Sequence, residues 1–278
     1  MPELPEVEVI RRDLEKEAEG KKIKAVEVNS MRVVRRHPNK KHFVKLLEDR
    51  KIRTVSRKGK YLLLRLDDEN TMVIHLGMSG QLLKEKSAKA PMEPHTHVVI
   101  TFTQGGQLRY VDPRQFGELF VAPKDELNEI AELAHLGIDP VEEPLSWQLF
   151  ASLLAQRKAK LKSVLMDQKF VAGIGNIYSD EILFAAGLRY DRQSDELASQ
   201  EVRRLYRSLL EILHEAIKYR GTSAADEQFR DLYGELGGYQ EFLKVYQHTN
   251  EPCRRCRTPI VRAKFSQRST WYCPQCQT

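Results

Sequence analysis

The segment IRTVSRKGKYLLLRLD, residues 52–67, carries the pattern that decides the fold of the first third of the chain. Its apolar residues tend to recur at every second position, which is typical of β-strands with one buried face. Similar runs, bounded by Gly, Asp or Asn, surround it: KIKAVEVNS, TMVIHLGMSGQLL, THVVITFTQGGQLRYVD and GELFVAP. Together these runs predict an antiparallel sandwich or barrel.

Outside these strands the apolar pattern becomes helical. One amphipathic helix is predicted ahead of the sheet from about Val7 to Ala18, with Ile10 and Leu14 on the same face. After about Asp125 the helical period dominates, and the acidic, proline-containing segment IDPVEEPLS indicates an interdomain linker. The later helices are predicted in SWQLFASLLAQ, KLKSVLMDQ, IYSDEILFAAG and ELASQEVRRLYRSLLEILHEAIKYRG.

Composition excludes several classes of protein. The 278 residues are 41% hydrophobic and 30% charged, which is ordinary for a soluble globular protein and argues against disorder. No apolar run approaches the roughly 20 residues that cross a bilayer. The acidic N-terminus does not resemble a signal peptide, so a cytoplasmic protein is expected. The length favours two domains.

The distribution of charge favours a polyanionic partner. The chain has a net charge of +6, and residues 31–66 hold thirteen Lys or Arg against two acids. Residues 251–278 hold six Lys or Arg against one acid, whereas residues 121–147 hold seven acids against one lysine. Two basic blocks separated by an acidic stretch indicate two surfaces that touch one polyanion. The alternative is an ordinary solvated surface.

All four cysteines lie at the C-terminal end, with the spacing Cys-x2-Cys-x16-Cys-x2-Cys. This spacing predicts two knuckles that close a tetrahedral thiolate site around one Zn²⁺ ion. Two disulfides are the alternative, which a cytosolic protein disfavours. Four thiolates leave no open coordination position, so the zinc is expected to be structural and to fold this short tail. The predicted ligands are Cys253, Cys256, Cys273 and Cys276.

The residues between the two cysteine pairs predict a hairpin. RAKFSQRSTWYC indicates two short strands around a turn at Ser266–Ser269, which holds Arg268 at the tip. A cation at such a tip can lie along a phosphate backbone. A small zinc ribbon that contacts protein is the alternative.

A second phosphate site is predicted in KFVAGIGNIYSDE, which lies between two helices. Gly173 and Gly175 permit a tight turn, and Asn176 stands where it caps the helix that follows. A turn of this kind at a helix N-terminus presents free N–H groups that suit a phosphate. Lys158, Lys160 and Lys162 precede it and complete a predicted clamp on the duplex backbone. The alternative is a turn whose glycines serve packing alone.

The N-terminus is the candidate for chemistry. Met1 precedes the small residue Pro2, so its removal is expected, and the new terminus is a secondary amine with a pKa much nearer neutrality than that of lysine. A neutral amine can attack a sugar C1′ and form an iminium, with Glu3 and Glu6 close by for proton transfer. The same residues also suit the first turn of a helix, which is the alternative interpretation.

These motifs occur in one order along the chain and together resemble the formamidopyrimidine-DNA glycosylases, bacterial base-excision repair enzymes. The order is MPELPEVE, RKGKYLLL, HLGMSG, EPHTHV, LRYVDPRQFG, LMDQKFVAGIGNIYSDEILFAAG, PCRRCRTPI and QRSTWYCPQC. The resemblance implies an α+β fold whose N-terminal antiparallel β-sandwich is flanked by helices, in residues 1–134. It then implies a linker in 135–148, a helical helix–two-turn–helix domain in 149–244 with a lesion-capping loop at about 221–242, and a four-cysteine zinc-finger β-hairpin in 245–278.

The resemblance also implies a role for each candidate residue. Pro2 would be the nucleophile, Glu3 the general acid, and Lys60 a catalytic lysine that contacts phosphate and lesion. Arg268 would grip the phosphates that flank the lesion. Met78, Arg114 and Phe116 would fill the gap left by the extruded base. Glu6 would support the same site as Pro2 and Glu3, and Asn176 would bind phosphate. His75 and His95 lie in motifs that approach DNA, and for each the alternative is a packed strand histidine. Lys158, from the predicted clamp, completes the candidate DNA contacts.

The function implied is that of a bifunctional DNA glycosylase and AP lyase. It would excise 8-oxoguanine and formamidopyrimidines from duplex DNA through a Schiff base on Pro2, followed by β- and δ-elimination. Its partner would be double-stranded DNA with oxidised bases or abasic sites, bound by a monomer in the bacterial cytoplasm, at the nucleoid. The alternatives are an endonuclease VIII-like glycosylase for oxidised pyrimidines and a non-catalytic protein that binds damaged DNA.

The chain departs from the family's pattern in the implied capping loop. Ala224, Ala225 and Asp226 stand where members carry a basic residue, and Asp231 and Glu235 add negative charge. An acidic loop near DNA either changes which lesions are held or points to solvent. Lesion preference is therefore the property most open to change. The other departures are Gln247 and His248 in place of a usual Gly-containing continuation, and Arg257 in place of a glycine.

Overall fold

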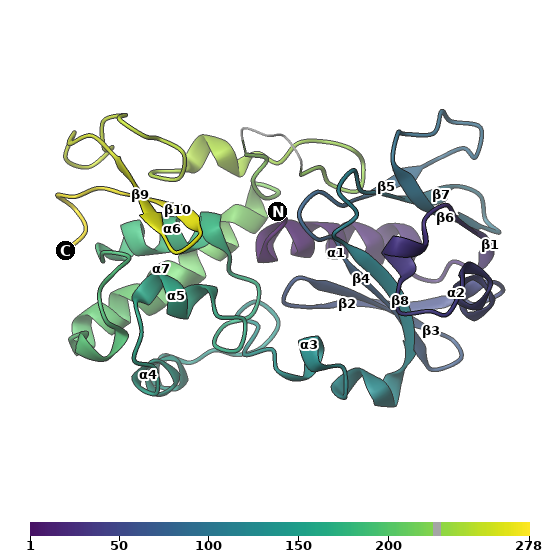
Figure 1. Ribbon diagram of the computed structural model, residues 1–278, viewed down its shortest axis with the longest axis horizontal. Coiled ribbons are helices and arrows are strands. Elements are labelled where there is room, and N and C mark those ends of the chain that lie inside the picture. The colour runs from purple at the N-terminus through teal and green to yellow at the C-terminus, as the bar shows by residue number, and fades with distance from the viewer. Residues whose placement is uncertain (225–228) are drawn as a thin grey trace. The chain divides into compact units, whose positions relative to one another are not determined.

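The computed structural model of the protein describes residues 1–224 and 229–278 (Figure 1). The chain forms two compact units, Met1–Ala134 with Tyr219–Gly238, and His135–Lys218 with Tyr239–Thr278. The boundaries drawn from the sequence place residues 219–238 in the helical domain, and that domain scheme stays a prediction. No described helix is both long enough and apolar enough to cross a membrane.

The first unit is built on two antiparallel sheets of four strands, as the alternating pattern predicted. One sheet has the order β1 (Ile23–Val28), β6 (Thr96–Phe102), β7 (Gln107–Val111), β5 (Gln81–Glu85). The other has the order β2 (Ile52–Lys58), β3 (Tyr61–Leu66), β4 (Asn70–His75), β8 (Glu118–Pro123). Within residues 52–67, β2 and β3 pair across a turn formed by Gly59 and Lys60.

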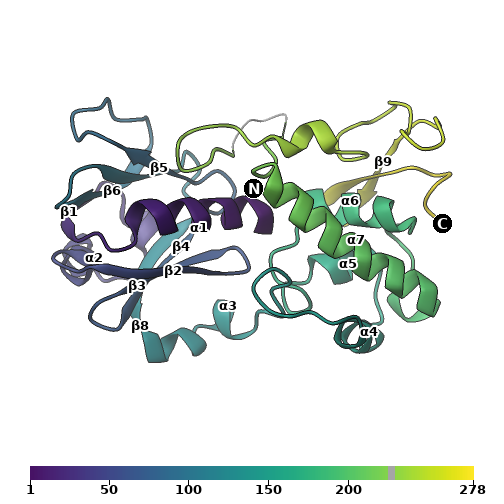
Figure 2. The ribbon, with the colours of Figure 1, turned by 180° about the vertical axis from the view of Figure 1, so that it is seen from behind.

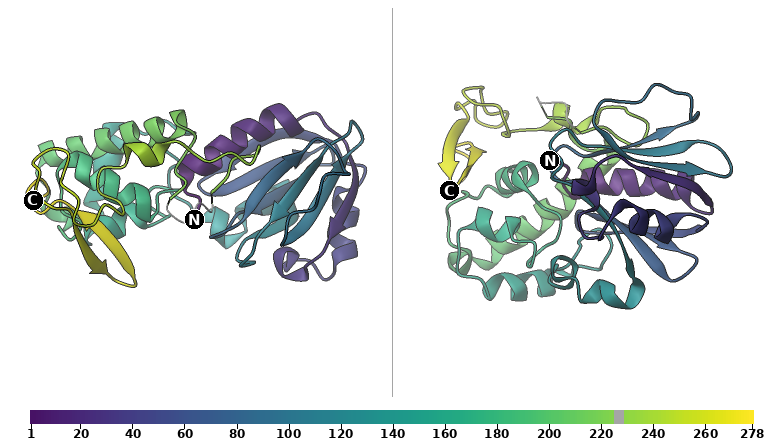
Figure 3. Two further views of the ribbon diagram at one scale, coloured as in Figure 1. Left: turned by 90° about the horizontal axis from the view of Figure 1, so that it is seen from above. Right: turned by 45° about the vertical axis from the view of Figure 1, so that its right-hand side comes forward.

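Two helices complete the core of this unit. Helix α1 (Leu4–Ala18) lies against the sheets (Figure 3). Its predicted apolar face packs in a core shared with residues of both sheets. It begins three residues earlier than predicted, because Pro5 and the acids before Val7 favour a first helical turn. Helix α2 (Lys40–Leu47) was not predicted, and its Phe43 packs in the same core. The short elements are η1 (Met31–Val34), η2 (Lys124–Asn128) and α3 (Ala131–Ala134).

The second unit is helical and ends in a β-hairpin. The four helices predicted after the linker are confirmed, and α6 and α7 lie side by side (Figure 2). Of the helical pattern in ELNEIAELAHLG, the structure forms only the short η2 and α3. The elements of this unit are α4 (Trp147–Ala155), α5 (Leu161–Met166), α6 (Asn176–Ala186), η3 (Ser194–Glu196), α7 (Ser199–Lys218), η4 (Tyr239–Phe242), β9 (Val261–Phe265) and β10 (Arg268–Tyr272).

Candidate nucleic-acid interface and catalytic site

The candidate nucleophile lies at the start of α1, where Pro2 and Glu3 are buried. The Glu3 backbone N–H donates to Glu6 Oε2 at 2.7 Å. Glu6 is itself only 1% exposed, and its Oε1 accepts the backbone N–H of Thr222 at 2.8 Å. The carboxylate of Glu6 therefore joins the residue beside Pro2 to the segment that follows α7.

Only glycine fits at the residue that lies against this carboxylate. Gly221 has a φ of +77°, in the left-handed region that favours glycine. A Cβ added to it would lie 2.8 Å from Glu6 Oε1. The glycine thus lets the backbone of residues 221–222 approach Glu6 closely enough for the Thr222 hydrogen bond.

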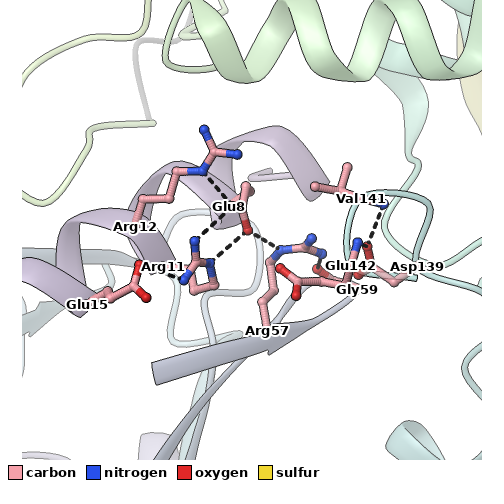
Figure 4. A network of polar contacts seen from close by, with 9 residues as sticks. All are labelled: Glu8, Arg11, Arg12, Glu15, Arg57, Gly59, Asp139, Val141 and Glu142. Carbon is pink, nitrogen blue, oxygen red and sulfur yellow. Dashed lines mark hydrogen bonds and ion pairs between the residues drawn. The ribbon is translucent and has the colours of Figure 1, made fainter. Parts of the chain in front are cut away.

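Lys60 lies on the turn between β2 and β3 and is 9% exposed. An ion pair connects this turn to α1 (Figure 4), because Arg57 Nε lies 3.1 Å from Glu8 Oε2 while Arg57 Nη1 donates to the Gly59 carbonyl at 2.9 Å. Burial raises the pKa of Glu8, but the guanidinium groups around it outweigh burial and hold that pKa below its usual range. The turn that carries Lys60 is therefore fixed to the helix that begins beside Pro2.

His75 lies at the end of β4, opposite Tyr61 of β3, the residue that follows Lys60. Its ring stacks on that of Tyr61, with 4.6 Å between the ring centroids. Burial, and then the charge of Lys60, lowers the pKa of His75 to about 4. His75 is therefore a neutral ring beside a lysine, with one face covered.

Met78, Arg114 and Phe116 lie on two adjoining turns of the first unit. The turns touch through their backbones, because a Cβ on Gly77 would lie 2.5 Å from the Gly117 nitrogen. Met78 and Phe116 are large apolar side chains that are 39% and 45% exposed. The Arg114 guanidinium lies 4.8 Å from the centroid of the Phe116 ring. The structure thus brings together the three side chains predicted to fill the space of an extruded base.

A buried carboxylate that the sequence analysis did not single out organises these turns. Asp112 is fully buried and accepts hydrogen bonds from Ser79 Oγ at 2.6 Å, from the Tyr110 hydroxyl at 3.1 Å, and from the backbone N–H groups of Arg114 and Gly117 at 3.2 and 3.0 Å. The sequence feature that could have identified Asp112 is its place before Pro in DPRQFG. An Asp side chain in a turn commonly accepts a hydrogen bond from the backbone N–H two residues later.

His95 lies on the loop before β6 and is exposed. Its φ is +63°, and its carbonyl accepts the Asp112 backbone N–H at 3.1 Å. The preceding loop is held by the fully buried Arg109, whose guanidinium donates to the carbonyls of Pro91 and Ala90 at 2.6 and 3.1 Å. The His95 side chain is thus presented to solvent from a fixed backbone.

Asn176 is the first residue of α6. The turn before it is held by Gln168, whose amide donates to the carbonyls of Ile174 and Met166 at 2.8 and 2.9 Å and accepts the Gly173 N–H at 2.9 Å. Asn176 Oδ1 is buried and has no hydrogen-bond partner among the described residues. The prediction that Asn176 caps α6 is wrong, because Gly175 is the N-cap and Asn176 is already the first helical residue, with no side-chain cap hydrogen bond. The sequence analysis gave no role to Gln168.

The three lysines predicted to complete this clamp do not share one environment. Lys158 and Lys160 are exposed in the connection between α4 and α5. Lys162 is fully buried, with Nζ 2.7 Å from Asp180 Oδ1. The prediction that Lys162 faces DNA is therefore wrong, because its ammonium group forms a buried ion pair with Asp180 inside the second unit. Asp180 also accepts the Thr270 hydroxyl at 2.5 Å, which fixes β10 to α6.

Arg268 is exposed at the start of β10, opposite Phe265. The hairpin turn is Ser266–Gln267, shorter than the predicted turn at Ser266–Ser269, so Arg268 belongs to the strand. A groove of about 490 Å³ lies beside it, and the residues that line the groove come from the hairpin turn and from the end of α5. Those residues are Ser163, Met166, Asp167, Phe265, Ser266, Gln267 and Arg268.

The four cysteines converge as predicted. Their sulfur atoms all lie within 4.8 Å of one another, with 3.4 Å between Cys256 and Cys273 and 3.9 Å between Cys253 and Cys276. Sulfurs about 2.3 Å from one tetrahedral zinc ion stand at separations of this size. The backbone N–H of Arg255 donates to Cys253 Sγ, as expected for thiolates in a zinc knuckle. These residues fit one structural zinc ion.

The antiparallel sandwich, the helical unit and the four-cysteine hairpin define a zinc-containing class of DNA glycosylases. Three family models match the chain: the formamidopyrimidine-DNA glycosylase N-terminal domain over residues 1–119, the H2TH domain of the same glycosylase over 136–228, and the zinc finger found in FPG and IleRS over 250–278. The chain belongs to the formamidopyrimidine-DNA glycosylase family.

Relatives of this family match the chain over its full length. The formamidopyrimidine-DNA glycosylase of Pelotomaculum thermopropionicum is 42% identical over 277 residues, covering 100% of this chain and 99% of its own. The Thermus thermophilus protein has a crystal structure with a TM-score of 0.89 at 36% identity, covering 99% of this chain and 98% of that one. The structure of a Lactococcus lactis variant in complex with DNA that contains Fapy-dG has a TM-score of 0.91 to this chain. The two chains are 35% identical, and the match covers 100% of each.

Proposed function

We propose that this protein is a bifunctional DNA glycosylase and AP lyase that excises 8-oxoguanine and formamidopyrimidines from duplex DNA. The observation that carries the proposal is the buried Pro2–Glu3 terminus, held by Glu6 at the start of α1 in a chain of this family. The Lactococcus lactis structures support the substrate class, since they contain DNA with Fapy-dG or an abasic site.

In the proposed mechanism, Met1 is removed and the Pro2 nitrogen attacks C1′ of the damaged nucleotide. The bond from C1′ to the base breaks, and the base leaves with the electron pair and takes up a proton. Glu3 supplies a proton to the sugar-ring oxygen as the ring opens, which yields an iminium between Pro2 and C1′. Loss of the 3′ phosphate and then of the 5′ phosphate by β- and δ-elimination leaves a one-nucleoside gap.

The remaining candidates serve binding in this proposal. A base can reach Pro2 only after it leaves the helix, which costs a few kcal/mol. Met78 and Phe116 occupy the vacated space as apolar wedges, and Arg114 hydrogen-bonds the orphaned cytosine. Lys60, Arg268 and the N-terminus of α6 at Asn176 contact phosphates. The wider set of DNA contacts comprises Glu6, His75, His95 and Lys158.

We also propose the setting in which the enzyme acts. One lesion needs one active site, so the enzyme acts as a monomer. Its substrate places it in the bacterial cytoplasm, associated with the nucleoid. The domain scheme is that predicted from the sequence, with residues 1–134 as the catalytic domain and 149–244 as the helical DNA-binding domain.

A second substrate class has one observation in its favour. A Lactococcus lactis protein that is 36% identical to this chain, with a TM-score of 0.90, was crystallised with DNA that contains an oxidised pyrimidine. Oxidised pyrimidines are therefore the competing substrate for the same Pro2 chemistry.

The test uses 5′-labelled duplexes that carry 8-oxoguanine opposite cytosine, an oxidised pyrimidine, or an abasic site. We expect cleavage of the 8-oxoguanine duplex to a fragment with a 3′ phosphate, the product of β,δ-elimination. Glu3→Gln serves as the inactive control. Cleavage of the pyrimidine duplex alone would favour the second class, and tight binding without cleavage would indicate a protein that only binds damage.

A further inference from the structure

The loop after α7 does not present the acidic surface that its sequence suggested. Ala225 and Asp226 lie outside the described residues. Asp231 is 2% exposed, with Oδ2 paired to Arg220 at 2.6 Å and Oδ1 accepting two backbone N–H groups. Glu235 is exposed. Among the described residues this loop therefore offers no cluster of free carboxylates, and the surface that stands out belongs instead to α7 itself.

Helices α4 and α7 pack on each other, and their contact leaves a groove of about 370 Å³. This volume falls within the range of ligand pockets, roughly 300–1,000 Å³. Its apolar walls are an indole, a phenol ring and a leucine side chain, each of them half-buried. The residues that line this α4–α7 groove are Trp147, Arg203, Tyr206, Arg207, Leu210 and Glu211.

The aromatic walls of the groove are held in place. The Tyr206 hydroxyl donates to the Leu145 carbonyl at 2.7 Å, and its ring centroid lies 5.7 Å from that of Phe150. Trp147 begins α4 directly after Ser146, whose side chain caps the helix. The groove is therefore preformed, and a partner that enters it pays little of the entropy cost of ordering its walls.

Two exposed cations flank these walls. Arg203 and Arg207 form no ion pair with any residue that the structure describes. The Arg203 guanidinium lies instead 4.7 Å from the centroid of the Trp147 ring. Elsewhere in the same unit, Arg157 and Arg189 are paired with nearby carboxylates. The fold thus leaves positive charge unneutralised at the edge of an apolar groove.

This combination suits an acidic peptide. An apolar side chain of the peptide gains free energy when it leaves water for the walls of the groove. Carboxylates on either side of it can pair with the guanidinium groups, which bind carboxylates through two parallel hydrogen bonds. Tryptophan, tyrosine and arginine are also the residue types that are enriched at the energetic centres of protein–protein interfaces.

A nucleic-acid strand suits the groove less well. Its backbone carries one charge at each phosphate and is bound by rows of cations. Glu211 lines this groove, and Glu142 and Glu143 are exposed a few residues before Trp147. A short peptide, which carries few charges, can place its carboxylates at the arginines and keep them away from Glu211.

We propose that the α4–α7 groove is a docking site for a short acidic segment of a partner protein. An apolar side chain of the segment enters between Trp147 and Tyr206, and its carboxylates pair with Arg203 and Arg207. The groove contains no candidate catalytic or DNA-contacting residue, so this inference is independent of the proposed function.

The test uses isotope-labelled, full-length, zinc-containing protein and a synthetic hexapeptide with phenylalanine and leucine between two pairs of acids. The chain has two tryptophans, and Trp271 is only 8% exposed. We expect the peptide to shift the NMR signal of the Trp147 indole N–H saturably, as assigned with Trp147→Phe, and to leave that of Trp271 in place. Peptides with serines for the apolar pair, or amides for the acids, should bind about tenfold more weakly or less.

Substitutions of the charged residues should act in opposite directions. Arg203→Gln/Arg207→Gln should weaken peptide binding by about tenfold or more, because both carboxylate pairs are lost. Glu211→Gln should strengthen it by about twofold or more, because a repelling charge is removed. Loss of folding cannot produce this gain. Arg53→Gln, at an exposed arginine of the first unit, is the matched control and should change nothing.

Absence of a Trp147 shift at about 1 mM peptide would overturn the proposal, as would binding that the arginine substitutions leave unchanged. A single-stranded oligothymidine that shifts the Trp147 signal where the peptide does not would also overturn it, and would make the groove a nucleic-acid surface.

Discussion

At the scale of single residues, the charge of Lys60 affects the protonation of His75, which lies opposite Tyr61 in the sheet. A protonated His75 beside Lys60 would place two cations together in a half-buried site. Burial and the Lys60 charge instead keep the imidazole neutral, and Tyr61 covers one of its faces. His75 therefore adds no positive charge beside Lys60.

We predict that His75 titrates near pH 4 in the folded protein, against about 6.5 for an ordinary histidine. Between these values the unfolded chain binds more protons at this residue than the folded chain does. Its contribution to the free energy of unfolding is therefore complete above about pH 6.5 and is lost as the pH falls toward 4. NMR titration of the imidazole C–H signals, assigned with His75→Gln, measures this pKa. A midpoint near 6.5 would contradict it.

Two residues that depart from the family's pattern stand at positions suited to glycine. Gln247 has a φ of +65° and Arg257 a φ of +70°. Such a conformation costs a residue with a side chain roughly 1–2 kcal/mol. The structure explains why a glycine is usual after the second cysteine, and nothing in it explains why this chain has arginine there.

At the scale of elements, the sequence predicts the strands and helices that have a local apolar pattern. It misses features that depend on residues far away in the chain. Strand β3 and helix α1 were predicted because their apolar residues recur with a clear period, whereas β6, β7 and β8 are buried at nearly every position and were recognised as short apolar runs between turn residues. Helix α2 was missed because its Phe43 and Leu47 stand in a lysine-rich run. Lys162 was misjudged because only the fold brings Asp180 to it.

The turns that carry Met78, Arg114 and Phe116 depend on Asp112, and we predict that Asp112→Ala lowers the free energy of unfolding by about 3 kcal/mol. The variant leaves several buried donors without an acceptor. Ser79→Ala removes one of these bonds as a matched control and should cost only about 1 kcal/mol. Urea denaturation measures both changes. Equal losses in the two variants would show that Asp112 does not organise the turns.

At the scale of the whole molecule, the basic block in residues 31–66 overstates the charge available to DNA. Arg57 pairs with Glu8, Arg36 with Glu118 and Glu132, Arg50 with Asp68, and Arg65 with Glu69. Several of these cations thus have acidic partners far away in the sequence. The sequence alone gives the count of charges, and the fold decides which of them remain for phosphates.

Zinc removal is expected to separate DNA binding from the folding of the first unit. A tail this short depends on its metal, and Arg268 and the β9–β10 hairpin belong to it. We predict that chelation abolishes binding to a lesion duplex, measured by fluorescence anisotropy, while amide hydrogen-exchange protection in β3 and β4 is unchanged. Added zinc should restore binding. Full affinity in the metal-free protein would contradict this prediction.

The central claim is that Pro2 forms the covalent intermediate, and borohydride trapping tests it most directly. Protein whose mass shows that Met1 is removed is incubated with borohydride and a duplex that carries 8-oxoguanine opposite cytosine. A preparation that retains Met1 serves as the control, because its Pro2 nitrogen is an amide. We predict a reduced covalent adduct that peptide mapping places on Pro2, and none in the control. An adduct on another residue, or none with tight binding retained, would contradict the mechanism.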